Sequence, residues 1–322
     1  MMRLPTFDYL EPSTIDEAVE LLVAHPGAEV VAGGTDLFPN MKRLQVCPPT
    51  VVTLGGIGGL SGIDGSEEDG FTIGALTPLH ELADSAEIPV ALASAAAEVA
   101  SPQIRNMATI GGNLCADTRC DYINQTEAWR LASGLCLKAD GDVCWVAPKG
   151  DQCVAVSASD LAPVVAALDA VVKLVGPDGE RSVPAADFYR SDGIDYLGKS
   201  ADEIITEITI PPSGRRRTAY RKLRRRGSID FPVLGVAAAV QMSEEGIVQD
   251  ARIVLGAISP APMRIRDAEE ALNGHLLDDE VIERVAQIAS GPVRPYDNVD
   301  LGSRYRKWMT PVYVTLALQD LR

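Results

Sequence analysis

The sequence has little of what nucleic-acid binding, membrane insertion or hydrolytic chemistry requires. Its 322 residues contain 29 Lys and Arg against 45 Asp and Glu, and the net charge of −16 argues against the dominant basic face that duplex binding needs. The best apolar runs, 161–168 and 233–240, are far shorter than the ~20 residues of a membrane helix. The three histidines are scattered, and no G-x-S-x-G or H-E-x-x-H motif supports a hydrolase.

No cysteine pair has the CxxC spacing of a zinc ribbon or a bacterial ferredoxin. Six cysteines are nevertheless present: Cys47 stands alone, and the other five lie between Cys115 and Cys153. The first ten residues lack the apolar core of a secretory signal. We therefore expect a cytoplasmic protein with reduced thiols, in which such a cluster indicates metal or redox chemistry.

Periodicity divides the chain into three units of mixed α and β structure. The first has β–α–β order, which favours a parallel strand pair, and its helix begins at a capping box formed by Thr14 and Glu17. The segment 211–214 (Pro-Pro-Ser-Gly) is the expected linker before the third unit, and 203–210 is expected as an edge or half-buried strand. The other expected strands are 30–32, 50–54, 71–74, 171–175, 181–183, 233–240 and 247–257, and the expected helices are 37–44, 77–83, 90–100, 268–272, 279–289 and 303–321.

Two glycine-containing loops are candidates for binding phosphate. The first, Ala32–Leu37, directly follows a predicted strand, and its glycines allow backbone N–H groups to approach an anion closely. The second is Thr109–Asn113, so the two loops together suggest two walls around a phosphate-bearing cofactor. Each loop also suits a plain strand-to-helix turn or a tight bend, and neither has Rossmann or P-loop spacing.

Four of the clustered cysteines have the spacing C-x15-C-x7-C-x8-C, and four thiolates suit a [4Fe–4S] cluster or a tetrahedral zinc ion. Cys115 follows the second glycine loop so closely that we assign it to the packing of that loop. The alternative is that the cysteines are small buried apolar residues. The predicted metal ligands are Cys120, Cys136, Cys144 and Cys153.

An arginine-rich run, 215–226, opens the third unit of this acidic chain. It suits either a phosphate or an acidic partner surface, or a strand with a solvated charged face. Lys222, inside the run, is a candidate counter-charge to a cofactor.

Four segments, in order and spread over nearly the whole chain, resemble the FAD-binding subunit of the xanthine oxidase (molybdenum hydroxylase) family. They are Ala32–Leu37, Ile104–Leu114, Ser159–Pro163, and Lys222 ahead of Arg224–Arg226. The resemblance implies an α+β fold with a PCMH-type FAD-binding domain and a C-terminal α+β domain built on a three-stranded sheet with helices. The implied boundaries are 1–211, with two α/β subdomains at about 1–55 and 56–211, and 212–322.

A long insertion, about 116–156, separates the second glycine loop from the Ser-Asp-x-x-Pro segment. It resembles the β subunit of 4-hydroxybenzoyl-CoA reductase, in which the insertion holds an additional [4Fe–4S] cluster. Asp117–Cys120, Cys136–Lys138 and the four-cysteine spacing carry this similarity.

The family resemblance implies a role for each matched residue. Backbone amides of the first loop cradle the FAD pyrophosphate, and the second loop forms the opposite wall. A carboxylate bonds polar groups on the flavin side, a lysine lies near the isoalloxazine ring, and a valine packs on the cofactor. These residues are Val31, Ala32, Gly33, Gly34, Thr35, Asp36 and Leu37; Thr109, Gly112 and Asn113; and Asp160, Lys222 and Val99.

The resemblance further implies an electron-transfer subunit of a molybdenum-dependent complex. A large molybdopterin subunit and a small [2Fe–2S] subunit are the expected partners, with ferredoxin as the electron donor and neither nucleic acid nor membrane involved. The expected reaction is that of a 4-hydroxybenzoyl-CoA reductase. One alternative is an oxidative hydroxylase or dehydrogenase of the same family, and another is an assembly protein with structural zinc.

Overall fold

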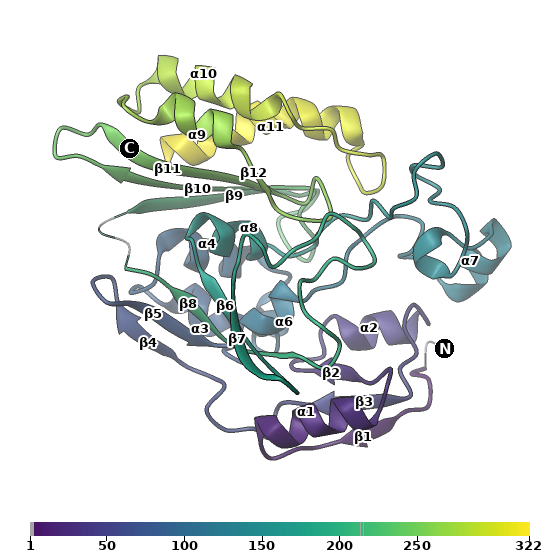
Figure 1. Cartoon of the computed structure of the whole chain (residues 1–322). Helices are drawn as coiled ribbons and strands as arrows, with labels where there is room; N and C mark the ends of the chain where they lie inside the picture. The colour runs from purple at the N-terminus through teal and green to yellow at the C-terminus, as the bar shows by residue number, and fades with distance from the viewer. Residues whose placement is uncertain (1–2, 213, 215) are drawn as a thin grey trace.

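Three separate β-sheets organise the chain, and the computed structural model describes them over residues 3–212, 214 and 216–322. The first sheet is parallel, with strand order β1-β3-β2, and α1 packs against it (Figure 1). The Thr14 hydroxyl caps α1 by accepting from the Glu17 N–H at 3.1 Å, as the capping box predicted. The elements of this unit are β1 (Asp8–Leu10), α1 (Ile15–Ala24), β2 (Glu29–Val31), α2 (Leu37–Lys42) and β3 (Thr50–Thr53).

The second sheet is antiparallel and has strand order β4-β5-β8-β6-β7. The strand expected to be an edge or half-buried strand, β8, lies between β5 and β6, and its buried and half-buried side chains fit the second alternative. Its polar residues alternate as in an edge strand, but alternation reports one solvated face and not the order of the strands. The elements are β4 (Ile63–Ser66), β5 (Gly70–Gly74), α3 (Leu79–Asp84), α4 (Val90–Glu98), α5 (Pro102–Arg105), α6 (Ile110–Leu114), α7 (Glu127–Ser133), η1 (Leu137–Ala139), α8 (Ala162–Ala167), β6 (Val171–Gly176), β7 (Gly179–Pro184) and β8 (Ile204–Ile210).

The third sheet has four strands in the order β12-β11-β10-β9, one more than the three expected. The additional strand is only two residues long and pairs with Val254 and Leu255, which is too short to leave a periodic signal in the sequence. The C-terminal helices cover the outer face of this sheet (Figure 1). The elements are β9 (Arg217–Leu223), β10 (Leu234–Met242), β11 (Val248–Gly256), β12 (Met263–Arg264), α9 (Arg266–Leu272), α10 (Asp279–Ser290) and α11 (Ser303–Gln319).

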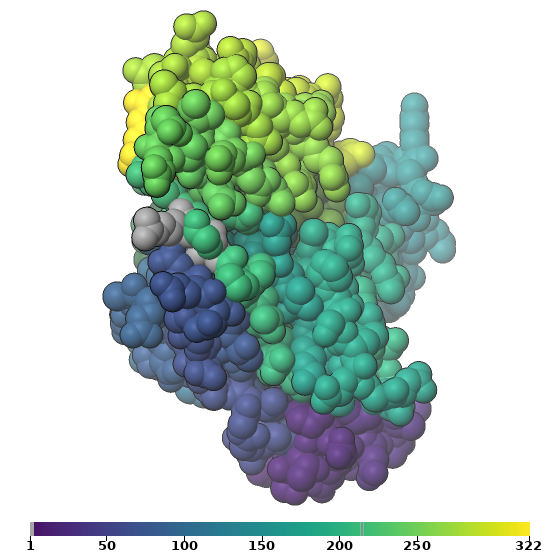
Figure 2. All heavy atoms as spheres, turned by 60° about the vertical axis from the view of Figure 1, so that its left-hand side comes forward, coloured from purple at the N-terminus to yellow at the C-terminus, as the bar shows by residue number. Residues whose placement is uncertain are grey.

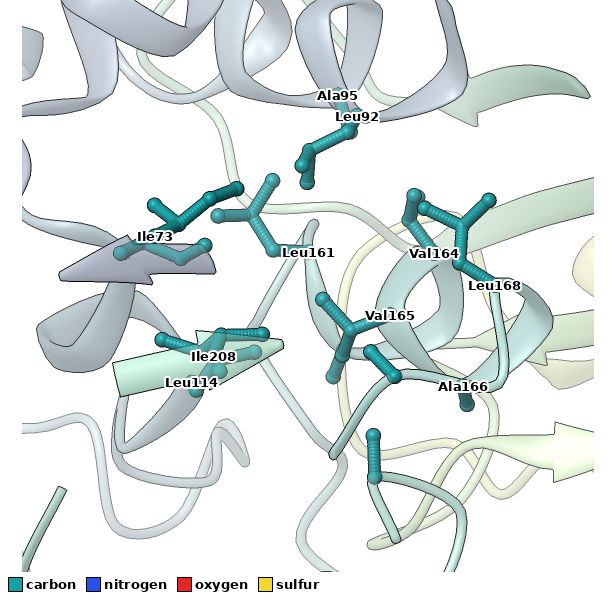
Figure 3. Close-up of a cluster of buried hydrophobic side chains, with 14 of the residues drawn as sticks. Ile73, Leu92, Ala95, Leu114, Leu161, Val164, Val165, Ala166, Leu168 and Ile208 are labelled. Atoms are coloured by element: carbon teal, nitrogen blue, oxygen red, sulfur yellow. The ribbon is translucent and has the colours of Figure 1, made fainter. Parts of the chain in front are cut away.

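Two helices, α4 and α8, fill the space between the second and third sheets (Figure 1). Every residue of α8 is buried, and Leu92 of α4 points toward Leu161 just before α8 (Figure 3). A Cβ at Gly256 of β11 would lie 2.9 Å from the Pro163 ring, so glycine lets the third sheet approach α8 closely. The N-terminal unit, the middle unit and the C-terminal unit therefore stack in sequence, and their order is visible in the space-filling view (Figure 2).

The expected α+β fold with two N-terminal subdomains and a C-terminal domain is confirmed, apart from the additional strand. The arginine-rich run forms β9 and the turn that follows it. Ser213 of the expected linker and Arg215 of the run lie outside the described residues. Within the part of the chain that is described, no helix combines the length and hydropathy needed to span a membrane.

Arg306 is the largest side chain that is completely buried, and it holds the C-terminal domain together from the inside. Its guanidinium donates to the carbonyl oxygens of Val233 at 2.8 Å, Ala257 at 2.7 Å and Tyr296 at 3.0 Å. Burial lowers the pKa of this guanidinium to about 10, which still leaves it charged at neutral pH. The arginine therefore satisfies three carbonyl groups that lie far apart in the sequence.

We expect Arg306→Met to lower the free energy of unfolding by about 3 kcal/mol, because the buried carbonyl groups lose their donors. Urea denaturation followed by circular dichroism measures this change. Arg304→Met, an exposed change on the same helix, is the matched control and should leave the unfolding curve in place. Equal curves for the two variants would contradict the structural role of Arg306.

Candidate functional site

The first glycine loop connects β2 to α2 and leaves its amides free. Within residues 3–212, 214 and 216–322, the backbone N–H groups of Gly33, Gly34, Thr35 and Asp36 have no hydrogen-bond acceptor. The Asp36 side chain does not cap α2, so the Leu37 N–H is also left without an acceptor in the described part of the chain, whereas the Phe38 and Asn40 N–H groups donate to the Gly34 and Asp36 carbonyl oxygens. A row of unpaired N–H groups at a helix start has the donor chemistry that a pyrophosphate requires.

The first glycine loop lies against the backbone just before the second glycine loop. A Cβ built on Gly33 would come within 1.7 Å of the Met107 carbonyl oxygen, so only glycine allows this contact between backbones. Gly34 has a φ of +68°, in the left-handed region, and a Cβ there would lie 2.5 Å from the Phe38 ring. Both glycines are therefore required by the local geometry of the loop.

The second glycine loop begins α6. The Thr109 hydroxyl caps this helix by accepting from the Gly112 N–H at 3.1 Å. The Asn113 side-chain oxygen accepts from the Ser159 hydroxyl at 2.7 Å and from the Leu161 N–H at 3.2 Å. Asn113 therefore ties the loop to the segment that starts α8.

Asp160 and Lys222 form a buried ion pair between the middle unit and β9. Their side chains are 3% and 1% exposed, and Lys222 Nζ lies 2.9 Å from Asp160 Oδ2. Tyr220 donates its hydroxyl to Asp160 Oδ1 at 2.8 Å, and Lys222 also donates to the Glu98 carbonyl oxygen at 2.9 Å. Burial raises the pKa of Asp160 and lowers the pKa of Lys222, while the charge of each partner opposes these shifts.

The predicted FAD residues therefore form one connected series. The first loop touches the residues just before the second loop. Asn113 of the second loop bonds Ser159, and Asp160 follows Ser159 and pairs with Lys222. Val99 lies at the end of α4, next to the Glu98 carbonyl that Lys222 contacts, and is almost fully buried. Free amides, a close-packed glycine cradle and a buried cation fit a flavin dinucleotide.

The four predicted metal ligands line a single small cavity in the lobe that carries α7 and projects from the body (Figure 1). All four are free thiols, while Cys115 lies outside the cavity as the C-cap of α6. Burial raises the pKa of the Cys120 thiol to about 12, so metal binding there must displace a proton. The cavity is lined by Cys120, Cys136, Cys144 and Cys153 together with Tyr122, Ile123, Leu137, Lys138, Trp145, Val146 and Ala155.

The four thiols of this cavity suit a metal ion or cluster that binds sulfur, but the cavity itself is small. The cavity holds about 10 Å³, so a [4Fe–4S] cluster would require the surrounding side chains to move outward. Among the residues described, no three His, Cys, Asp or Glu side chains are placed so that they could hold a metal ion. The sequence prediction that the four cysteines lie together is thus supported, and the identity of their ligand is a matter for proposal.

The C-terminal domain holds the base of the lobe. The Asn298 carbonyl oxygen accepts from the Asp121 N–H at 2.8 Å, and the Asn298 side chain donates to the Val154 carbonyl oxygen at 2.6 Å. These two contacts are adjacent to Cys120 and Cys153, the first and last ligands of the set. Asn298 is completely buried.

Sequence analysis gave no role to Arg119, which the structure places against the first glycine loop. Its guanidinium forms an ion pair with Asp36, donates to the Asn40 side chain at 3.2 Å and lies 4.4 Å from the centre of the Phe231 ring. The only signal in the sequence was its position inside the segment Asp117–Cys120, one of those on which the expected resemblance to the reductase subunit rests. Nothing local predicts contacts with residues so distant in the chain.

Comparison with known families gives the class of this protein. Residues 5–213 match the FAD binding domain in molybdopterin dehydrogenase, and residues 218–321 match the CO dehydrogenase flavoprotein C-terminal domain. The fold and the site therefore define an FAD-binding subunit of an oxidoreductase. The chain belongs to the FAD-binding family of the molybdopterin dehydrogenases.

Relatives match over almost the full length. The chain is 34% identical to the FAD-binding subunit PaoB of an aldehyde oxidoreductase from Escherichia coli, over 84% of this chain and 87% of that protein. It is 29% identical to the carbon monoxide dehydrogenase medium chain of Afipia carboxidovorans, over 98% and 96%. The structure of carbon monoxide dehydrogenase from Hydrogenophaga pseudoflava matches with a TM-score of 0.80 and 28% identity, over 99% and 98% of the two chains.

We expect Gly33→Ala to raise the dissociation constant for FAD by about tenfold or more, because the added methyl group forces the two loops apart. Equilibrium titration of the flavin-free protein, followed by flavin fluorescence, measures the change. Gly58→Ala is the control, since a Cβ at Gly58 meets nothing within 4 Å. Unchanged FAD binding in Gly33→Ala would remove the loop contact from the cofactor site.

Proposed function

We propose that this chain is the FAD-carrying electron-transfer subunit of a molybdenum-dependent complex that oxidises its substrate. The family match and the connected series of predicted FAD residues support this function. The relatives described above are named for oxidation of an aldehyde and of carbon monoxide, which favours the oxidative direction. Substrate chemistry is assigned to a partner subunit.

In this proposal the chain's own residues bind and orient the flavin. The amides from Val31 to Leu37 hold the pyrophosphate, and Thr109, Gly112 and Asn113 line the opposite wall. Asp160 and Lys222 lie on the side of the ring, where the lysine charge favours reduced, anionic flavin, and Val99 packs on the cofactor. When bound, FAD supplies the exchange between two-electron and one-electron transfer.

We further propose that Cys120, Cys136, Cys144 and Cys153 hold a [4Fe–4S] cluster. Four free thiols line one cavity, and both ends of the lobe, next to Cys120 and Cys153, are hydrogen-bonded to Asn298. These two observations support this assignment. When bound, such a cluster supplies single-electron transfer. Structural zinc in an assembly protein is the competing assignment, and metal analysis of anaerobically purified protein separates the two.

The proposed partners are a large molybdopterin subunit and a small [2Fe–2S] subunit, with a ferredoxin as the external electron carrier. The relative from Afipia carboxidovorans is named a medium chain, which supports a complex with further subunits. The proposed location is the cytoplasm, because the four thiols need a reducing compartment.

The second candidate is a 4-hydroxybenzoyl-CoA reductase, which runs in the opposite direction. The four-cysteine cavity in the insertion favours it. The complex purified through this subunit decides the direction: reduction of bound flavin by aldehydes supports the oxidative function. Oxidation of the reduced complex by 4-hydroxybenzoyl-CoA, with no response to aldehydes, would establish the reductase. Purification without any molybdopterin subunit would refute both.

We expect Cys136→Ser to abolish stoichiometric iron and the broad absorbance near 400 nm while FAD stays bound, because the flavin loops lie outside the lobe. Iron and flavin assays on the same anaerobic sample measure both quantities. Cys47→Ser, at the exposed isolated cysteine, is the control and should keep both cofactors. Loss of FAD together with iron in a folded Cys136→Ser protein would contradict separate sites.

A further inference from the structure

The insertion that carries the cysteines begins and ends at a stem, where Arg119 pairs with Val156. Backbone contacts fix the position of Arg119 in this stem. Its N–H donates to the Val156 carbonyl oxygen at 2.8 Å, and its carbonyl oxygen accepts from the Val156 N–H at 2.9 Å. The residue is 8% exposed although it carries a full charge. Removing a charged guanidinium from water costs free energy, and pairing with an opposite charge offsets this cost.

The pairing partner is Asp36, a residue of the proposed pyrophosphate cradle. Asp36 Oδ1 is in an ion pair with Arg119, and Asp36 Oδ2 accepts from the Asp117 N–H at 3.0 Å. Two of the bonds to the carboxylate thus come from the stem of the lobe, and a third comes from the Asn40 side chain, which donates to Asp36 Oδ2 at 3.3 Å. Asn40, one turn further along α2, accepts from the same guanidinium.

A carboxylate at this position opposes the binding of an anion. The free amides of Gly33 to Asp36 would hold a doubly charged pyrophosphate close to the Asp36 side chain, and unpaired like charges at such a distance repel strongly. Arg119 neutralises the carboxylate and fixes its orientation. Among the described residues, Arg119 Nε also has no hydrogen-bond acceptor although it is buried, so the guanidinium retains one donor for an oxygen of a bound ligand.

We propose that Arg119 is a positioning residue for FAD, supplied to the N-terminal cradle by the insertion that carries the cysteines. This inference rests on the proposed FAD site, and it gives the lobe a second task that does not depend on its metal. The stem contact with Val156 holds Arg119 in place whether or not the cysteines are loaded. The lobe therefore contributes to flavin binding through Arg119 in its stem and to the proposed metal site through its four cysteines.

The test compares FAD dissociation constants of flavin-free wild-type protein, Arg119→Met, and the double variant Asp36→Asn with Arg119→Met. Arg119→Met leaves the Asp36 charge uncompensated, and we expect the dissociation constant to rise by about tenfold or more. The double variant removes both charges and should recover a large part of this loss, since the penalty comes from the carboxylate. Arg119→Lys keeps the charge and should bind FAD better than Arg119→Met.

Arg181→Met is the matched control, because it breaks an arginine–carboxylate pair with Glu203 on the surface of the second sheet, away from both loops. It should leave the dissociation constant unchanged. Wild-type affinity in Arg119→Met, or a double variant no tighter than the single one, would overturn the positioning role. If the wild-type protein itself takes up no FAD, the proposed function fails instead, so the two failures are distinguishable.

Discussion

The architecture depends on one buried ion pair. Asp160 lies at the start of α8 in the middle unit and Lys222 lies on β9 of the C-terminal sheet, and neither charge is solvated. A buried charge is tolerated only when its partner is in place, so the two units cannot separate without exposing an uncompensated ion. The bond that Tyr220 donates to Asp160 adds a second constraint from β9. Residues proposed to face the flavin are thus the same residues that fix the relation of the two domains.

Local signals in the sequence predicted the local structure well. The capping box at Thr14 and the apolar spacing after it locate α1, and the first glycine loop falls where β2 gives way to α2. For β8 the sequence left an edge strand and a half-buried strand open, because strand order is decided by pairing between distant segments, on which alternation carries no information. The additional strand β12 was missed because two residues leave no periodic pattern.

The same difference between local signals and contacts between distant segments applies to the candidate site. The four cysteines of the insertion line one cavity, but among the described residues no three of these side chains are placed to hold a metal ion, so their role as ligands stays a prediction. The contacts of Arg119 with Asp36 and Phe231 were not predictable, because they join three segments that only the tertiary fold brings close. The family resemblance supplied the roles of the FAD residues, whereas the structure supplied the continuity between them.

The two hydrogen bonds between Asn298 and the lobe have a consequence for biosynthesis. Both stems of the lobe depend on a residue close to the C-terminus, whereas the cysteines themselves leave the ribosome much earlier. During translation the two ends of the insertion therefore lack this anchor until Asn298 has been made, although Gln45 and the carbonyl groups of Arg43 and Leu44, made earlier, also hold the lobe through Ile123 and Arg130. A chain truncated before Asn298 would accordingly lack the bonds that hold the base of the proposed metal centre.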